Sequence, residues 1–272
     1  MRNKVAVAMS VYKADSPIYL KEALESIYNQ LNVSVFVFLQ VDGNIPKSLK
    51  SVIEFYDQRS DFLLEYYPDN KGLAFQLNRA IARIGQSGGF KFIARMDADD
   101  ISLPSRFERQ ICFFDGNPEI AVVGTSVIEF FDDGRRFSKV MMPNHSDLVS
   151  HLIRRCPFNH PTVMFNMDVI LLKDVNYDES LMNTQDYYLW VDLVCKKYIF
   201  SNINEPLLEF RVDSDFHSRR GMKKAINDFK SRFYAMRKLK AFTVSNVIHS
   251  FLLFFLRLSP PYIKEYAYKN FR

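Results

Sequence analysis

The chain has 272 residues, 48% of them hydrophobic, and can fill the core of one large domain or of a domain with an appendage. Its three cysteines, Cys112, Cys156 and Cys195, are scattered, which excludes a CxxC redox or zinc motif, and residues 1–15 do not resemble a signal peptide. The net charge is +5, and residues 219–240 alone carry +8, which leaves −3 for the rest. We expect a cytosolic protein with reduced thiols.

Strands and helices are predicted to alternate through the first third of the chain. Apolar runs of strand length occupy residues 5–12, 33–41, 62–67 and 90–96. Ser16 and Pro17 are typical of a helix start. Two helices are indicated by apolar residues at helical spacing, namely Leu20, Leu24, Ile27 and Leu31 in one and Leu73, Leu77, Ile81 and Ile84 in the other. This alternation predicts an α/β fold with a mostly parallel sheet covered by helices on both faces.

Polar residues follow three of these strands: Asp42, Asn70 and Asp97. Parallel sheets bind ligands beyond the carboxyl ends of their strands, so the three side chains are predicted to share one rim. Taken singly, Asp42 and Asn70 are equally typical of residues that begin turns or cap helices.

Three aspartates crowd the end of the fourth strand. Asp97 and Asp99 are two residues apart, so in extended backbone both side chains project to one side. Such carboxylates repel unless a cation or a donor-rich ligand joins them, and oxygen ligands favour Mg²⁺ or Mn²⁺ over zinc. We interpret the pair as a metal site that holds substrate phosphates. Asp100 is expected to cap the helix that begins near Pro104.

The second half is less regular. Residues 120–131 and 160–165 are predicted strands, and residues 184–196 a helix that buries its apolar side. Trp190 in this helix either packs in the core, which we favour, or forms a wall of the acceptor site. His160 either lines a substrate site or serves as a turn residue before its proline. The glycines at 85–89 follow a helix and precede a strand, so they indicate a turn and not a phosphate loop.

Four segments together resemble a known family: residues 5–30, "DNKGLAFQLNRAI", "ARMDADDISLPSRFERQ" and "TQDYYLW". They look like the successive motifs of the family 2 glycosyltransferases, inverting enzymes of the GT-A fold. The similarity runs from about Val5 to His217. It implies a Rossmann-like GT-A catalytic domain over residues 1–218, with a nucleotide-sugar half at about 1–100 and an acceptor half at about 101–218.

The resemblance also implies roles for individual residues on the nucleotide side. Ser10, Val11 and Tyr12 would form the loop that lines the nucleotide base, and Asp42 would hydrogen-bond that base. The remaining contacts to nucleotide or sugar would come from Asn70, Gly72 and Arg95. Many relatives have a second acidic residue after this strand, whereas "VDGN" has only Asp42.

For the reaction itself, the resemblance implies a metal-dependent direct displacement at the anomeric carbon. Asp97 would contact the ribose or the metal, and Asp99 would be the main ligand of Mn²⁺ or Mg²⁺. Asp186 would be the catalytic base. His217 lies where some relatives supply a late metal ligand. Gln185 stands where glutamate usually precedes the base.

The implied function is transfer of a sugar from a nucleoside-diphosphate sugar, with UDP-sugars as the first expectation, to a hydroxyl of a saccharide acceptor. A nucleotidyltransferase that makes the sugar nucleotide remains an alternative, although no glycine-rich triphosphate loop follows the first strand. A second alternative is a non-catalytic, membrane-associated sugar-binding protein that kept the fold.

The C-terminal region combines charge with an apolar stripe. Residues 219–240 contain nine Lys or Arg and one Asp. The stripe follows at helical spacing: Val244, Val247, Ile248, Phe251, Leu252, Phe255 and Leu258. This stretch is too short to span a bilayer. Residues 219–272 are therefore predicted to be a basic, amphipathic helical extension that attaches the protein peripherally to the anionic inner face of a membrane, where a lipid-linked acceptor would lie. Nucleic acid is not expected as a partner, because no aromatic stacking motif accompanies the charge.

Overall fold

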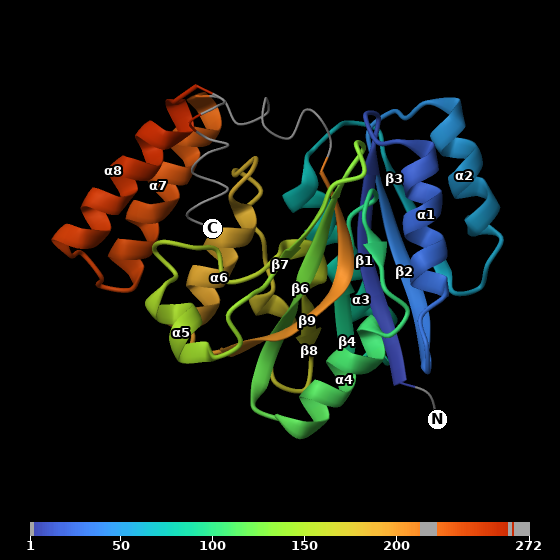
Figure 1. Ribbon diagram of the computed structural model, residues 1–272. Coiled ribbons are helices and arrows are strands. Elements are labelled where there is room, and N and C mark those ends of the chain that lie inside the picture. The colour runs from blue at the N-terminus through green and yellow to red at the C-terminus, as the bar shows by residue number, and fades with distance from the viewer. Residues whose placement is uncertain (1–2, 213–221, 261–262, 264–272) are drawn as a thin grey trace.

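The computed structural model describes residues 3–212, 222–260 and 263 (Figure 1). A nine-stranded sheet has the order β3-β2-β1-β4-β8-β6-β9-β5, and β7 pairs with β6. The strands are β1 (Asn3–Tyr12), β2 (Val33–Asp42), β3 (Phe62–Tyr67), β4 (Phe92–Arg95), β5 (Ile101–Ser102), β6 (Ile120–Phe131), β7 (Arg136–Lys139), β8 (Met164–Asn166) and β9 (Ile199–Val212). The helices are α1 (Pro17–Tyr28), α2 (Lys47–Asp57), α3 (Leu73–Ser87), α4 (Arg106–Gly116), α5 (His145–Ser150), α6 (Gln185–Cys195), α7 (Met222–Lys238) and α8 (Val244–Leu258), with short 3-10 turns at His160–Thr162 and Leu172–Asp174.

The first half of the sheet is parallel, as the sequence predicts. β1 lies between β2 and β4 and pairs in parallel with both. Tyr12 is opposite Asp42, and Ala8 is opposite Arg95. The carboxyl ends of these strands therefore meet along one edge. In the second half, β8 is antiparallel to β4 and β6, whereas β6 and β9 are parallel.

Two apolar cores lie on the two faces of the sheet. One joins the sheet to α1, α2 and α4, with side chains such as Leu24, Ile53 and Phe107 completely buried. The other joins the sheet to α3 and α6, where Leu77 and Trp190 are buried. Burial of a large apolar side chain stabilises the fold by about 1.5–3 kcal/mol. Coverage of both faces explains why the central strands are apolar along their whole length.

Sequence signals for the ends of helices predicted the start of α1 and the end of α3 correctly. The Ser16 hydroxyl accepts a hydrogen bond from the Tyr19 N–H at 3.5 Å, and Pro17 is the first residue of α1. Leu31 was expected on the buried side of this helix, but α1 ends at Tyr28 and Leu31 is 51% exposed. Gly88 ends α3 with a positive φ of 65°, which fits the predicted turn.

Other predictions were wrong in extent. The strand expected at residues 90–96 covers only Phe92–Arg95, and the one expected at 160–165 is a 3-10 turn followed by β8. The sequence did not predict α2, α5, β5, β7 or β9.

α7 and α8 form a helical hairpin that packs on α6. Met236 and Ala235 of α7 are buried with Tyr187 and Val191 of α6. Figure 1 shows this hairpin at the opposite end of the molecule from α1 and α2. No helix among the described residues is both long and apolar enough to cross a membrane.

Candidate active site

The aligned strand ends bring the predicted nucleotide-side residues to one edge of the sheet. Ser10, Val11 and Tyr12 end β1; Val11 is buried, and Tyr12 is 38% exposed. The Tyr12 N–H donates to the Asp15 carboxylate at 2.8 Å, which turns the chain toward α1. Asp42 is the last residue of β2, directly beside Tyr12. The first strand and its neighbour thus end at the same level.

Asp42 organises the loop that precedes α3. Its carboxylate accepts hydrogen bonds from the Lys71 N–H at 2.7 Å and the Gly72 N–H at 2.9 Å, and from Gln76 Nε2 at 2.7 Å. The Asn70 side chain donates to the Asp42 carbonyl at 3.4 Å. Asp42 is only 5% exposed. The structure therefore joins Asp42, Asn70 and Gly72 in one hydrogen-bonded unit, with the carboxylate already engaged by the protein.

Asp97, Asp99 and Asp100 form a compact acidic cluster after β4. Each offers a carboxylate oxygen, and these oxygens lie within 4.8 Å of one another. Partial loss of hydration and repulsion from the Asp97 carboxylate raise the pKa of Asp99 to about 6, although part of the Asp99 side chain reaches the surface. Burial and the same repulsion raise the pKa of Asp100 well above its usual range. Crowded carboxylates of this kind are energetically costly until a positive charge joins them.

Two buried arginines lie beneath this cluster. Arg95 is 3% exposed and forms an ion pair with Asp97. Its Nε and Nη1 atoms are buried without a hydrogen-bond partner from the described residues. Arg106 is fully buried and donates to the Arg95 carbonyl at 2.9 Å. Burial lowers the pKa of Arg106 to about 9, while the Asp100 carboxylate acts in the opposite direction.

The predicted capping role of Asp100 is wrong. α4 begins at Arg106 after Ser105. Asp100 is 1% exposed, and its Oδ1 atom accepts a hydrogen bond from the backbone N–H of Arg211 in β9 at 3.0 Å. Asp100 therefore ties the acidic cluster to a strand distant in sequence, an arrangement that local spacing does not reveal.

Asp186 lies in the first turn of α6. Burial raises its pKa, whereas the Tyr187 N–H, Lys224 and Arg95 act to lower it. The charges of Arg95, Asp186 and Asp97 all act on the hydroxyl of buried Tyr177. Asp186 and Asp97, from different parts of the chain, therefore both act electrostatically on Tyr177.

His160 belongs to the same neighbourhood. Its Nε2 atom lies 2.9 Å from the Tyr177 hydroxyl, and its ring packs 6.0 Å from that of Trp190, which is fully buried as expected. Burial lowers the pKa of His160 well below its usual range, so the imidazole is neutral near pH 7. His160 and Tyr177 therefore form a neutral hydrogen-bonded pair beside the site.

Three residues of the site were missed by sequence reasoning: Tyr177, Arg106 and Arg211. Tyr177 and Arg211 lie in segments without a recognisable motif. Arg106 lies inside the "SLPSRFERQ" segment, but its burial was not expected of a charged residue on a helix. The predicted ligand His217 lies outside the described residues.

The acidic cluster fits a hard divalent cation. The donors are carboxylate oxygens only, which suits Mg²⁺ or Mn²⁺. Asp100 Oδ2 is buried without a protein partner among the described residues, so an oxygen lone pair is left unused there. Asp97 and Asp99 are the side chains that reach toward solvent and could bind a metal diphosphate.

An α/β sheet with a carboxylate cluster at its strand ends and a further carboxylate in the first turn of a later helix is typical of a GT-A glycosyltransferase. The sequence model described as glycosyl transferase family 2 matches residues 6–172. The chain belongs to this family and is a glycosyltransferase.

Relatives support the assignment over almost the whole chain. The amylovoran biosynthesis glycosyltransferase AmsE of Erwinia amylovora is 29% identical over 98% of both chains. The UDP-Gal:alpha-D-GlcNAc-diphosphoundecaprenol beta-1,3-galactosyltransferase of Escherichia coli is 30% identical over 98% of this chain and 96% of that protein.

Solved structures share the fold. S. aureus TarS residues 1–349, in complex with UDP-GlcNAc, aligns with a TM-score of 0.62 and 13% identity over 97% of this chain and 83% of that one. The mannosyltransferase PcManGT of Pyrobaculum calidifontis, in complex with GDP-Man and Mn²⁺, aligns with a TM-score of 0.57 and 15% identity over 99% and 80% of the two chains. The predicted GT-A fold is confirmed.

Proposed function

We propose that the protein transfers a sugar from a UDP-sugar to a hydroxyl of a lipid-linked saccharide, with inversion at the anomeric carbon, during assembly of a polysaccharide. The observation that carries the proposal is a pair of carboxylate groups: the compact Asp97–Asp99 cluster with its Arg95 ion pair, and Asp186 in the first turn of α6, whose charge acts on Tyr177 together with that of Asp97. One group suits the departing diphosphate, and the other suits the attacking hydroxyl.

On the donor side, the chain must hold a diphosphate that gains negative charge as it leaves. Asp97 and Asp99 would hold Mn²⁺ or Mg²⁺, which when bound supplies Lewis-acid stabilisation of that charge. Arg95, fixed by its ion pair with Asp97, adds a positive charge that needs no reorganisation. Asp42, Asn70 and Gly72, together with Ser10, Val11 and Tyr12, form the edge on which the nucleotide would lie.

On the acceptor side, Asp186 would accept the proton of the attacking hydroxyl. A positioned base contributes typically about 10²- to 10⁴-fold. Burial raises the pKa of Asp186, which makes its carboxylate a stronger base than that of an ordinary aspartate. Inversion requires a single displacement, so one base is sufficient.

Similar proteins support the choice of substrates. The S. aureus TarS structure contains UDP-GlcNAc, and the E. coli relative is named for a UDP-Gal donor and a diphosphoundecaprenol-linked acceptor. The relative from Erwinia amylovora is named for biosynthesis of amylovoran. A UDP-sugar and a lipid-linked saccharide are therefore the substrates we propose for this chain.

A lipid-linked acceptor suits peripheral attachment through the α7–α8 hairpin. Six large apolar side chains of α8 are exposed: Val244, Ile248, Phe251, Leu252, Phe255 and Leu258. α7, which packs on α8, carries exposed Lys223, Lys230 and Arg237. Apolar side chains next to cations match the interface of an anionic membrane. We therefore propose residues 219–272 as the membrane-associating region and residues 1–218 as the catalytic domain.

The proposed reaction is tested with purified full-length protein and a panel of UDP- and GDP-sugars, with a lipid-linked saccharide as acceptor. UDP with Mn²⁺ should raise the melting temperature, EDTA should abolish the shift, and one UDP-sugar should give a product of inverted configuration. Formation of a sugar nucleotide and pyrophosphate from a sugar phosphate and UTP would instead identify a nucleotidyltransferase. Binding of sugar without turnover under every condition would identify a non-catalytic protein.

A further inference from the structure

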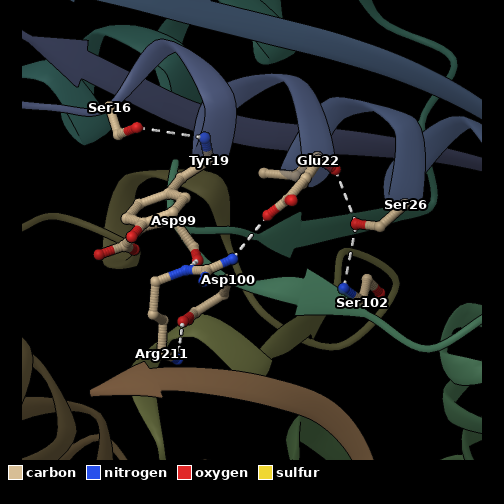
Figure 2. Close-up of polar contacts among 9 residues, drawn as sticks. Ser16, Tyr19, Glu22, Ser26, Asp99, Asp100, Ser102 and Arg211 are labelled. Atoms are coloured by element: carbon tan, nitrogen blue, oxygen red, sulfur yellow. Dashed lines mark hydrogen bonds and ion pairs between the residues drawn. The ribbon is translucent and has the colours of Figure 1, made fainter. Parts of the chain in front are cut away.

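Arg211 joins three segments of the chain at the acidic cluster (Figure 2). Its backbone N–H donates to Asp100 Oδ1 at 3.0 Å, and its Nε atom donates to the backbone carbonyl of Asp99 at 3.0 Å. Its Nη2 atom forms an ion pair with Glu22 of α1 at 2.6 Å. The guanidinium also lies over the ring of Tyr19, 3.7 Å from its centroid. The backbone N–H, Nε, Nη2 and the face of the guanidinium therefore each have a partner.

The three segments carry different parts of the site. α1 begins at Pro17, one short turn after Ser10–Tyr12, which we propose for the nucleotide. The loop with Asp99 provides the carboxylates for the metal diphosphate. β9 ends at Val212, one residue after Arg211. The Arg211 side chain therefore links α1 to the metal-binding loop at Asp99 itself.

Other contacts between α1 and this loop lie farther along the chain. The Ser26 hydroxyl of α1 accepts from the Ser102 N–H at 3.0 Å, and Oε1 of Gln30, two residues after α1, accepts from the Phe107 N–H of α4 at 3.0 Å. These contacts hold the loop where it enters β5 and α4. Because they do not depend on Arg211, the loop should stay attached to α1 when Arg211 is replaced, and the change should be confined to Asp99 and Asp100.

We propose that Arg211 is a positioning residue that fixes the Asp99 carboxylate for a nucleoside diphosphate with its divalent cation. The proposal rests on the proposed function. An arginine is required because the planar guanidinium donates in two directions while its face packs on Tyr19. A lysine could keep one charge contact with Glu22 but would lose either the Asp99 carbonyl or the stacking. Arg211 acts through the backbone of Asp99 and need not touch the substrate.

The test compares Arg211→Ala, Arg211→Lys and Glu22→Gln in the full-length protein. Calorimetry measures the affinity for UDP in saturating Mn²⁺ and the half-saturating Mn²⁺ concentration at fixed UDP. We expect Arg211→Ala to lower the UDP affinity and to raise the half-saturating Mn²⁺ concentration, each at least about tenfold. For Arg211→Lys we expect changes of about three- to tenfold, as for lost hydrogen bonds to an anchored loop. Glu22→Gln keeps an acceptor oxygen without its charge, so it should change the UDP affinity and the half-saturating Mn²⁺ concentration by about threefold or less. In turnover, the KM for the donor should rise, while kcat at saturating donor and Mn²⁺ stays within about threefold.

Arg59 provides a matched control. Its guanidinium lies 3.9 Å from the centroid of the Tyr28 ring and pairs with Asp61 at 2.8 Å, so it makes the same kinds of contact as Arg211. It lies beside the start of β3, away from the strand ends that carry the acidic cluster. Arg59→Lys should change neither the UDP nor the Mn²⁺ affinity, even if it lowers the melting temperature as much as Arg211→Lys does.

The outcomes separate this proposal from the proposed function. If wild-type protein binds UDP with Mn²⁺ but both Arg211 variants bind as tightly as wild type, Arg211 does not position Asp99. Equal weakening by Arg59→Lys and Arg211→Lys would also overturn the proposal, because the effect would then be general destabilisation. Failure of wild-type protein to bind any nucleotide would instead refute the proposed function.

Discussion

Asp186 faces opposing influences on its charge. Burial favours the neutral acid, whereas Lys224 and Arg95 favour the carboxylate, and the net effect is a raised pKa. A catalytic base works only when it is unprotonated. Proton uptake should therefore abolish turnover on the acid side at a higher pH than for an ordinary aspartate with a pKa of about 4.

The first prediction concerns this pH dependence. kcat should be constant above the raised pKa of Asp186 and fall tenfold per pH unit below it, because each unit reduces the ionised fraction tenfold. Asp186→Asn should lower kcat by about 10²- to 10⁴-fold and leave UDP affinity within about twofold. The profile of kcat against pH, with calorimetry for UDP, measures both. Asp115→Asn, an exposed aspartate near the end of α4, is the control and should keep the wild-type profile.

A second prediction concerns Asp42, whose two oxygens face only donors. In Asp42→Asn, an NH₂ group must point at either the Gly72 N–H or the Lys71 N–H and Gln76 Nε2. We expect a loss of about 1–3 kcal/mol in the free energy of unfolding, since a buried donor is left unsatisfied. UDP should also bind more weakly. Urea unfolding and calorimetry measure these effects. Asp133 accepts from the Arg135 N–H at 3.0 Å in an exposed turn, so Asp133→Asn should have little effect on either quantity.

The parts of the site that lie next to a strand end could be predicted from sequence, and the parts brought in by the second half could not. Asp97 and Asp99 follow β4 directly, so their proximity is a property of local backbone. Arg211 reaches the same place because β9 returns beside β6 and β5. Sequence spacing does not predict that pairing, because more than one hundred residues separate Arg211 from the acidic cluster.

Among the secondary structure elements, those with strong periodicity were predicted well. α3 buries Leu77, Ile81 and Ile84 as their spacing requires. α2 has the same kind of spacing in Leu49, Ile53 and Tyr56, but polar residues make up much of the segment, so its apolar periodicity was too weak to predict a helix. β9 was missed for a different reason. Its middle, "SNINEP", is polar and contains Pro206, and the pairing with β6 is irregular there.

The pairing of β6 with β9 leads to a third prediction, at Gly124. A Cβ atom on Gly124 would lie 2.4 Å from Asn202 Oδ1 and 2.7 Å from Phe158 Cδ1, both closer than normal contact. Asn202 also donates to the carbonyls of Met142 and Pro157 and has little freedom to move. Gly124→Ala should therefore lower the free energy of unfolding by about 1–3 kcal/mol through overpacking.

Urea unfolding of Gly124→Ala beside Gly116→Ala tests this prediction. Apart from its chain neighbours and its own helix backbone, no described residue comes within 4 Å of the Cβ position at Gly116, which ends α4, so alanine there should be neutral or slightly stabilising. Equal stability of the two variants would show that the β6–β9 pairing can relax around a methyl group.

Over the molecule as a whole, the basic block is less available to a membrane than its charge indicates. Lys238 pairs with Asp192 at 3.2 Å, and the Arg232 guanidinium lies 4.2 Å from the centroid of the Tyr187 ring. These contacts attach the hairpin to α6, which carries Asp186. Deletion of the hairpin would expose the apolar face of α6, so point substitutions on the outer face of α8 are the better probe of membrane attachment.

The fourth prediction therefore uses Leu252 and Phe255, which are 64% and 62% exposed on α8. Leu252→Ser with Phe255→Ser should reduce binding to vesicles that contain anionic lipid by at least about tenfold, since each lost apolar side chain removes up to about 1.5–3 kcal/mol of burial. The melting temperature should change little, because neither side chain is in the core. Phe55 is 73% exposed on α2 at the other end of the molecule, and Phe55→Ser should bind vesicles like wild type. Binding should also weaken as salt is raised, because the cations of α7 are screened. Cosedimentation that is the same for all three proteins and independent of salt would show that α8 does not contact the membrane.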